Sequence, residues 1–137
     1  MKRLTLAFLP LLSACAGEPP QNIGVLEGRL ADCPDSPNCV CSYETRESHY
    51  IDPINANLAT VEQVLVDMGN VNIVKADTNY LYAEFTSRLM GFVDDVEFLF
   101  DPAAGVTHVR SASRMGYSDM GVNRERIESI RSALNSQ

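Results

Sequence analysis

Three segments between residues 79 and 114 alternate apolar and polar side chains, and this pattern constrains the fold more than any other feature. Residues 79–89, 92–100 and 106–114 have the period of two that is typical of β-strands, and residues 71–74 predict a shorter strand. The turns between the later strands are short, at Met90-Gly91 and at residues 101–105. Short turns connect antiparallel neighbours, so we expect an antiparallel sheet.

Two amphipathic helices flank the predicted strands. Residues 55–68 carry apolar side chains at helical spacing, and Asn55 or Asn57 can cap the start. Asn123 can cap a final helix whose apolar stripe continues to Leu134. A chain of 137 residues, 45% of them hydrophobic, is sufficient for one core. The predicted fold is therefore α+β and two-layer, an antiparallel sheet of about four strands with two helices packed on one face.

The sheet face that the helices leave free is expected to carry mixed charges. Alternation places Asp95 and Glu97 on this face and Asp94 on the other. Two adjacent carboxylates could bind a hard cation or share a proton for acid–base chemistry. We favour an exposed ion-pair lattice, in which Arg88 and Arg110 on neighbouring strands neutralise the acids. The charged and polar residues expected on this face are Glu84, Thr86, Arg88, Asp95, Glu97, His108 and Arg110.

The first fifteen residues have the form of an export signal. Basic residues 2 and 3 precede a nine-residue apolar run at 4–12, which is too short to span a bilayer as a helix. Leu12-Ser13-Ala14-Cys15 resembles the lipobox of bacterial lipoproteins, although Ala14-Cys15-Ala16 also suits cleavage of an ordinary secreted protein. We predict a signal peptide at 1–14, a lipidated Cys15 with a tether to residue 29, and a domain at 30–137. Ala16 favours the outer membrane, on its periplasmic side, if the host has two membranes.

Three cysteines remain in the predicted domain, an odd number for an oxidising compartment. Prolines and turn formers between Cys33 and Cys39 favour a disulfide between these two, and a Cys33–Cys41 bridge is the alternative. A redox-active disulfide or a thiolate metal site is less favoured, because the spacings fit neither and the chain has only two histidines. We therefore predict no metal and no cofactor.

Three motifs together resemble a known family. Residues 33–40 (CPDSPNCV), 91–98 (GFVDDVEF) and 110–126 (RSASRMGYSDMGVNRER) are similar to an uncharacterised family of bacterial and plastid proteins, the domain of unknown function DUF1499. The resemblance spans about residues 30–134 and implies no catalytic activity. The family usually has Ser where Cys41 stands, which supports the Cys33–Cys39 pair.

Arginines, hydroxyls and an amide gather around the last predicted strand and the following loop, and could cradle an anion. An equally favoured interpretation is structural, with the arginines tying the loop to nearby carboxylates. The candidate binding residues are Arg88, Asp94, Arg114, Tyr117, Asp119, Asn123 and Arg124. The candidate catalytic residues are Asp95, Glu97, Arg110 and Arg114.

Composition narrows the function class. A formal net charge of -7 is the wrong sign for general binding to nucleic acid. We expect a lipid-anchored envelope protein that is not an enzyme and binds a small anionic ligand or an envelope protein. The alternatives are an envelope hydrolase or transferase with an anionic substrate and, less favoured, a thiol-redox protein.

Overall fold

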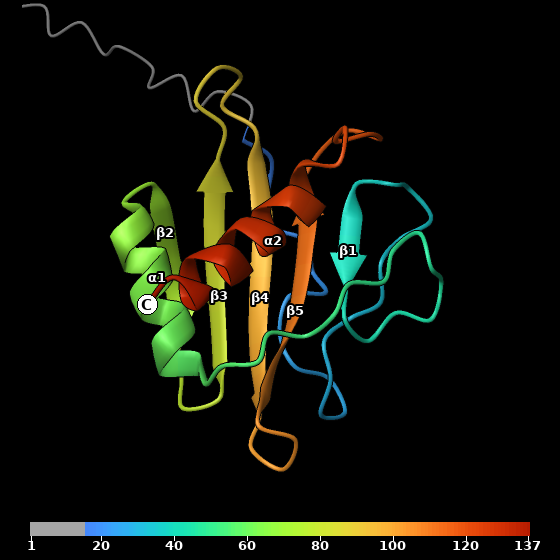
Figure 1. Ribbon diagram of the computed structural model, residues 1–137. Helices are drawn as coiled ribbons and strands as arrows, with labels where there is room; N and C mark the ends of the chain where they lie inside the picture. Colours follow the sequence, from blue (N-terminus) through green and yellow to red (C-terminus); the bar gives the residue numbers. More distant parts are fainter. Residues whose placement is uncertain (1–15) are drawn as a thin grey trace, which may run out of the picture.

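One antiparallel sheet and two helices make up the fold, which a computed structural model describes for residues 16–137 (Figure 1). The predicted signal peptide and Cys15 lie outside these residues. The strand order is β1-β5-β4-β3-β2. Within the described part, no helix is both long enough and apolar enough to cross a membrane. The elements are β1 (Cys39–Cys41), α1 (Leu58–Met68), β2 (Val71–Ala76), β3 (Tyr80–Thr86), β4 (Val93–Asp101), β5 (Val106–Ser113) and α2 (Val122–Asn135).

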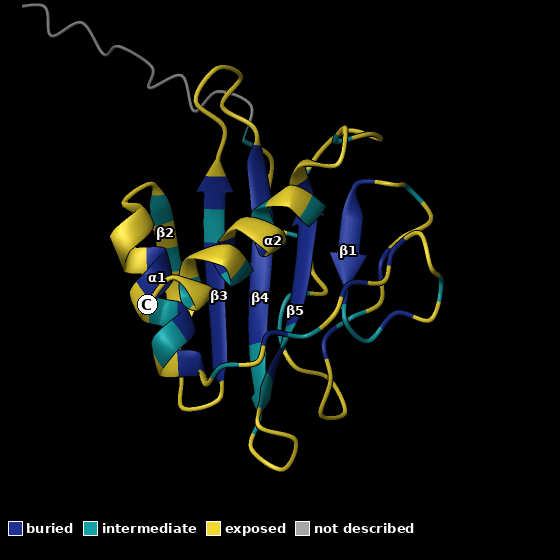
Figure 2. Ribbon diagram, viewed as in Figure 1, coloured by how far each residue is buried: buried dark blue, intermediate teal, exposed yellow. Residues whose placement is uncertain are grey.

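Both helices lie on the same face of the sheet (Figure 1), so the predicted two-layer α+β architecture is confirmed. The apolar sides of β3, β4 and β5 are buried beneath the helices. The outer sides of the helices themselves are exposed (Figure 2). Alternation along the strands and the helical stripes together create this core, because every second strand residue meets a helix. Fully buried core residues include Val61, Leu81, Val96, Phe98, Val109, Ile127 and Ile130.

The sheet has one strand more than the number of about four that the sequence predicts. The additional strand is β1, whose Cys39 pairs with Ala112 and whose Cys41 pairs with Arg110 of β5. Three residues are too few to show a period of two, and prolines precede them in the chain. This short strand brings the cysteine segment to the edge of the sheet.

The start of α2 differs from the prediction. Of the two predicted cap residues, Asn57 is the one that caps α1. Its side chain accepts a hydrogen bond from the Thr60 amide at 2.9 Å. Asn123 does not cap α2, because the helix begins at Val122 and its cap residue is Gly121. The Asp119 carboxylate accepts a hydrogen bond from the Asn123 backbone amide at 3.0 Å. It thus satisfies an N–H group of the first turn that has no partner within the helix.

Residues 16–32, expected as a tether for most of their length, run behind the sheet on the side opposite the helices (Figure 1). The Gly24 amide donates to Glu97 at 2.7 Å, and Leu30 packs against Tyr80 and Tyr82. The predicted exposed ion-pair lattice is therefore wrong: Asp95 and Glu97 are fully buried, and neither pairs with Arg88 among the described residues. We call this side the polar face, defined by Tyr80, Tyr82, Glu84, Asp95, Glu97, Arg110 and Arg114.

Candidate functional site

Asp95 and Arg114 form the best-connected pair on the polar face. Arg114 donates to both oxygens of the fully buried Asp95, from Nε at 3.1 Å and from Nη2 at 2.6 Å, and it also reaches Glu84 at 2.6 Å. The Tyr82 hydroxyl adds a 2.6 Å hydrogen bond to Asp95. Arg114 holds the pKa of Glu84 below its usual range, and Asp95 above all raises the pKa of Arg114. Both oxygens of Asp95 are engaged, so it is a poor choice for an acid–base catalyst.

Glu97 is fully buried but only half satisfied. Its Oε1 accepts the Tyr80 hydroxyl at 2.8 Å and the Gly24 amide at 2.7 Å. Its Oε2 has no hydrogen bond within residues 16–137. Burial raises the pKa of Glu97, while the bonds from Gly24 and Tyr80 oppose the shift. Glu97 is therefore more easily protonated than an ordinary glutamate.

Arg110 is the least satisfied charged group that the structure describes. Its side chain is 3% exposed, and its nearest acidic atom is the Oε2 of Glu97 at 3.6 Å from Nη1. Neither Nε nor Nη1 finds a hydrogen-bond partner in the described chain. A guanidinium deprived of both water and hydrogen-bond acceptors is costly, so this position requires an explanation.

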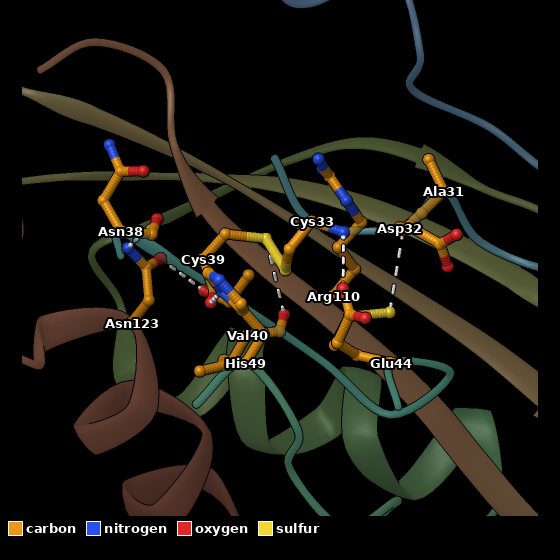
Figure 3. The surroundings of a disulfide bond; sticks show 12 residues. Ala31, Asp32, Cys33, Asn38, Cys39, Val40, Glu44, His49, Arg110 and Asn123 are labelled. Carbon is orange, nitrogen blue, oxygen red and sulfur yellow. Dashed lines mark hydrogen bonds between the residues drawn. A yellow bond between two sulfur atoms is a disulfide. The ribbon is translucent and has the colours of Figure 1, made fainter. Parts of the chain in front are cut away.

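A cavity of about 400 Å³ borders Arg110. Asp95, Arg114 and Ala112 contribute from the sheet, Cys33 from the disulfide loop and Asn22 from the N-terminal segment. Figure 3 shows the Arg110 side chain beside Cys33 and Asp32 on this side of the disulfide. A cavity of about 480 Å³ lies elsewhere, lined only by residues 21–32, and touches none of the charged strand residues. We therefore place the candidate site at the smaller cavity.

The disulfide segment forms one wall of the site. Cys33 and Cys39 are bonded as predicted, which excludes the Cys33–Cys41 alternative (Figure 3). Cys41 is a free, buried thiol, and burial raises its pKa. Glu44 binds the start of the disulfide loop, because its carboxylate accepts a hydrogen bond from the Cys33 amide at 3.3 Å. Glu44 is itself paired with Arg46 at 2.5 Å. Arg46, first through its hydrogen bond, lowers the pKa of Glu44 to about 2.

The remaining candidate residues lie away from the cavity. Asp94 faces the helix layer, as predicted, and pairs with Arg126 at 2.5 Å. Asn123 is buried, and Arg124 contacts the Ser48 carbonyl at 3.2 Å. Tyr117 and Arg88 are exposed in separate loops. The predicted cradle is thus divided between structural contacts on the helix side and the cavity on the polar face.

Three groups that complete the polar face are not among the candidate residues predicted from the sequence. Tyr80 and Tyr82 share the face of Glu84 by simple alternation, and that pattern could have marked them as partners for Asp95 and Glu97. The Gly24 amide carried no such signal, because its contact with Glu97 joins residues 73 positions apart.

These features define a class: a disulfide-stabilised two-layer α+β domain with a buried arginine on its covered polar face. The chain belongs to the family described as Protein of unknown function (DUF1499), whose model matches residues 29–134, as the sequence motifs indicated. No curated protein and no solved structure matches the chain. Arg110, Glu97 and the disulfide all lie within the matched residues.

Proposed function

We propose that this protein is a lipid-anchored envelope protein that binds a small anionic ligand, a carboxylate or a phosphate, and is not an enzyme. The observation that carries the binding role is the buried guanidinium of Arg110: its Nε and Nη1 lack partners within the described residues, and the residue lines a cavity. A bound anion would supply acceptors for these donors in the geometry that guanidinium groups favour.

The charges around the cavity support an anionic occupant. Of the two acidic residues in its lining, Asp95 is neutralised by Arg114, and Asp32 is paired with Arg29. In this lining, Arg110 alone has buried side-chain donors without a hydrogen-bond partner in the described chain. A volume of about 400 Å³ lies in the lower part of the range for small-molecule sites, roughly 300–1,000 Å³. A small molecule therefore fits this site.

Calorimetry tests the binding role. Inorganic phosphate and acetate, titrated into the mature protein at constant ionic strength, should bind to the wild type. Arg110→Gln should weaken binding about tenfold or more, because charge-assisted hydrogen bonds are lost. Glu97→Gln should strengthen it, because the carboxylate nearest to Arg110 is neutralised.

Arg124→Gln is the matched control, since Arg124 donates only to a backbone carbonyl and should leave binding unchanged. Circular dichroism confirms that each variant is folded. Equal affinities for the wild type, Arg110→Gln and Glu97→Gln would contradict an anion site at Arg110. A result in which neither phosphate nor acetate binds would contradict it as well.

The anchor has its own support and test. The basic start, the short apolar run and Leu12-Ser13-Ala14-Cys15 favour lipidation and, in a host with two membranes, the periplasmic side of the outer membrane. Metabolic labelling with an alkyne fatty acid should mark the wild type and Cys41→Ser equally, but not Cys15→Ala. Labelling of Cys15→Ala would place the acyl group elsewhere and contradict this assignment.

One observation favours the alternative of a hydrolase or transferase. Glu97 has a raised pKa and a free Oε2 beside Arg110, which is a suitable arrangement for a general acid next to an anion clamp. Turnover of an anionic substrate that Glu97→Gln abolishes and Arg124→Gln preserves would establish the enzyme. A thiol-redox role has less support, because Cys41 is buried with a raised pKa and so forms little thiolate.

A further inference from the structure

Two loops lie side by side at one end of the sheet. The turn at 87–92 joins β3 to β4, and the loop at 114–121 joins β5 to α2. Antiparallel pairing brings them together: Asp94 is opposite Ser113, and the Arg114 amide donates to the Val93 carbonyl at 3.0 Å. Figure 1 shows both loops projecting beyond the same end of the strands. We call residues 87–92 and 114–122 the loop end.

The loop end is unusually apolar for an exposed surface. Seven of the thirteen exposed large hydrophobic side chains in the described chain belong to it, although it comprises few of the residues. Leu89 is 95% exposed and Met120 is 92% exposed. Apolar groups concentrated on a surface mark a contact with another apolar phase or molecule. The seven residues are Leu89, Met90, Phe92, Met115, Tyr117, Met120 and Val122.

The backbone holds one of these side chains outward against its preference. Met120 has a φ of 53°, in the left-handed region that residues other than glycine seldom adopt. It is followed by Gly121, with a φ of 83°, so the chain turns sharply at the tip of the loop. A nearly fully exposed methionine in this conformation gains nothing from the rest of the domain, which indicates a role outside it.

The charge of the loop end differs from that of the whole chain. The protein has 18 acidic residues and a net charge of -7, yet the loop end contains only Asp119, Arg88 and Arg114. Asp119 accepts the amides of the first turn of α2, and Arg114 is paired with Asp95. Arg88 is thus the one exposed charge here without an ion pair in the described structure. An anionic phospholipid surface would meet the exposed cation and the apolar side chains, and the one carboxylate of the loop end, Asp119, is engaged by the Gly121 and Asn123 amides.

The predicted anchor leaves the domain at this same end. Arg114 donates to the Gly17 carbonyl at 3.3 Å, and a side chain at Gly17 would meet the Met115 sulfur at 3.1 Å. Cys15 is two residues before Gly17, a reach of at most about 7 Å. Acyl chains on Cys15 would therefore enter a bilayer immediately beside Met115 and its neighbours.

We infer that the loop end is a membrane-docking surface, which inserts its apolar side chains into the interface of the phospholipid bilayer that holds the Cys15 acyl chains. The inference rests on the proposed lipid anchor and extends it: the anchor tethers the chain, and the loop end fixes its orientation. Tyr, Phe, Met and Leu side chains bury their apolar parts at the headgroup boundary when a tether holds them there.

Depth-dependent fluorescence of the full acylated protein tests the inference. An environment-sensitive probe is attached to Met120→Cys or Leu89→Cys in a Cys41→Ser background, and the protein is reconstituted in vesicles of phosphatidylethanolamine and phosphatidylglycerol. The control is Ala103→Cys, because Ala103 is exposed in the β4–β5 turn at the opposite end of the sheet. We expect a blue shift and several-fold stronger quenching by brominated lipid at positions 120 and 89, with neither at 103.

The other results distinguish the failures. Intact mass shows whether Cys15 is acylated. An acylated protein whose probes at 120 and 89 are as exposed to water as the probe at 103 would overturn docking and leave the anchor intact. An unacylated Cys15 would overturn both proposals. Shielding that appears without vesicles and grows with protein concentration would replace the bilayer by a second copy of the chain.

Discussion

Asn123 lies at the centre of a buried polar cluster, and we expect its truncation to be among the most destabilising substitutions on the helix side. Its Nδ2, which has two hydrogens, has three acceptors within hydrogen-bond distance: Asp119 at 2.8 Å, Ser113 at 2.9 Å and the Asn38 carbonyl at 3.1 Å. Its Oδ1 accepts the Ser111 hydroxyl at 2.7 Å and Arg126 at 2.9 Å. One amide thus connects α2 with β5 and with the residue that precedes β1.

Asn123→Ala removes all five of these contacts, but most partners keep another one. The Asn38 carbonyl still accepts the Ser113 amide, and Arg126 keeps Asp94. The buried Ser111 hydroxyl loses its acceptor, which costs about 1–3 kcal/mol, and the lost bonds add about 1 kcal/mol or more. We therefore expect about 3 kcal/mol, a large part of a typical stability of about 5–15 kcal/mol.

Urea unfolding followed by circular dichroism measures this loss as a lower midpoint at unchanged slope. The control is Asn72→Ala, since Asn72 is exposed and makes one side-chain hydrogen bond, to Glu84 at 3.1 Å. The control should cost about 0.5 kcal/mol or less. A loss below about 1 kcal/mol for Asn123→Ala, or equal losses for the two variants, would contradict a central role of Asn123 in the buried cluster.

Two further predictions concern the disulfide segment. Replacing Cys33 and Cys39 together by Ser should lower the free energy of unfolding by about 2 kcal/mol, because a short loop is released in the unfolded chain; unchanged urea midpoints for the oxidised wild type and the variant would contradict it. Glu44 has its pKa lowered from 4.5 to about 2 by Arg46, so its stabilising contribution is present above pH 4.5 and is lost as the pH falls toward 2. The stability difference between wild type and Glu44→Gln should therefore shrink over that range, and a difference independent of pH would count against the pairing.

The sequence was informative wherever a regular period met a buried layer. Alternation along residues 79–114 placed Leu81, Val96 and Phe98 toward the helices, and the structure confirms that arrangement. It also separated Asp94 from Asp95 and Glu97. Local pattern is sufficient for such assignments, because the pleat of a strand fixes which side chains share a face.

The burial of the polar face could not be predicted in the same way. Glu97 and Arg110 look like surface residues in the sequence, since charged side chains are seldom fully buried. What covers them is residues 16–32, a segment with no period and with partners far along the chain, such as Gly24 on Glu97. For the same reason the unsatisfied donors of Arg110, on which the candidate site depends, became visible only in the structure.

The pairing of the N-terminal third with the last strands has a consequence for the order of folding. Gly17 contacts Arg114, Gly24 contacts Glu97, and β1 has β5 as its only strand partner in the described sheet. A chain that crosses a membrane N-terminus first cannot make these contacts until residue 114 has emerged. If the chain is exported as proposed, the segment that follows Cys15 would therefore stay unfolded throughout translocation. An enzyme that modifies Cys15 would have the whole transit time in which to reach it.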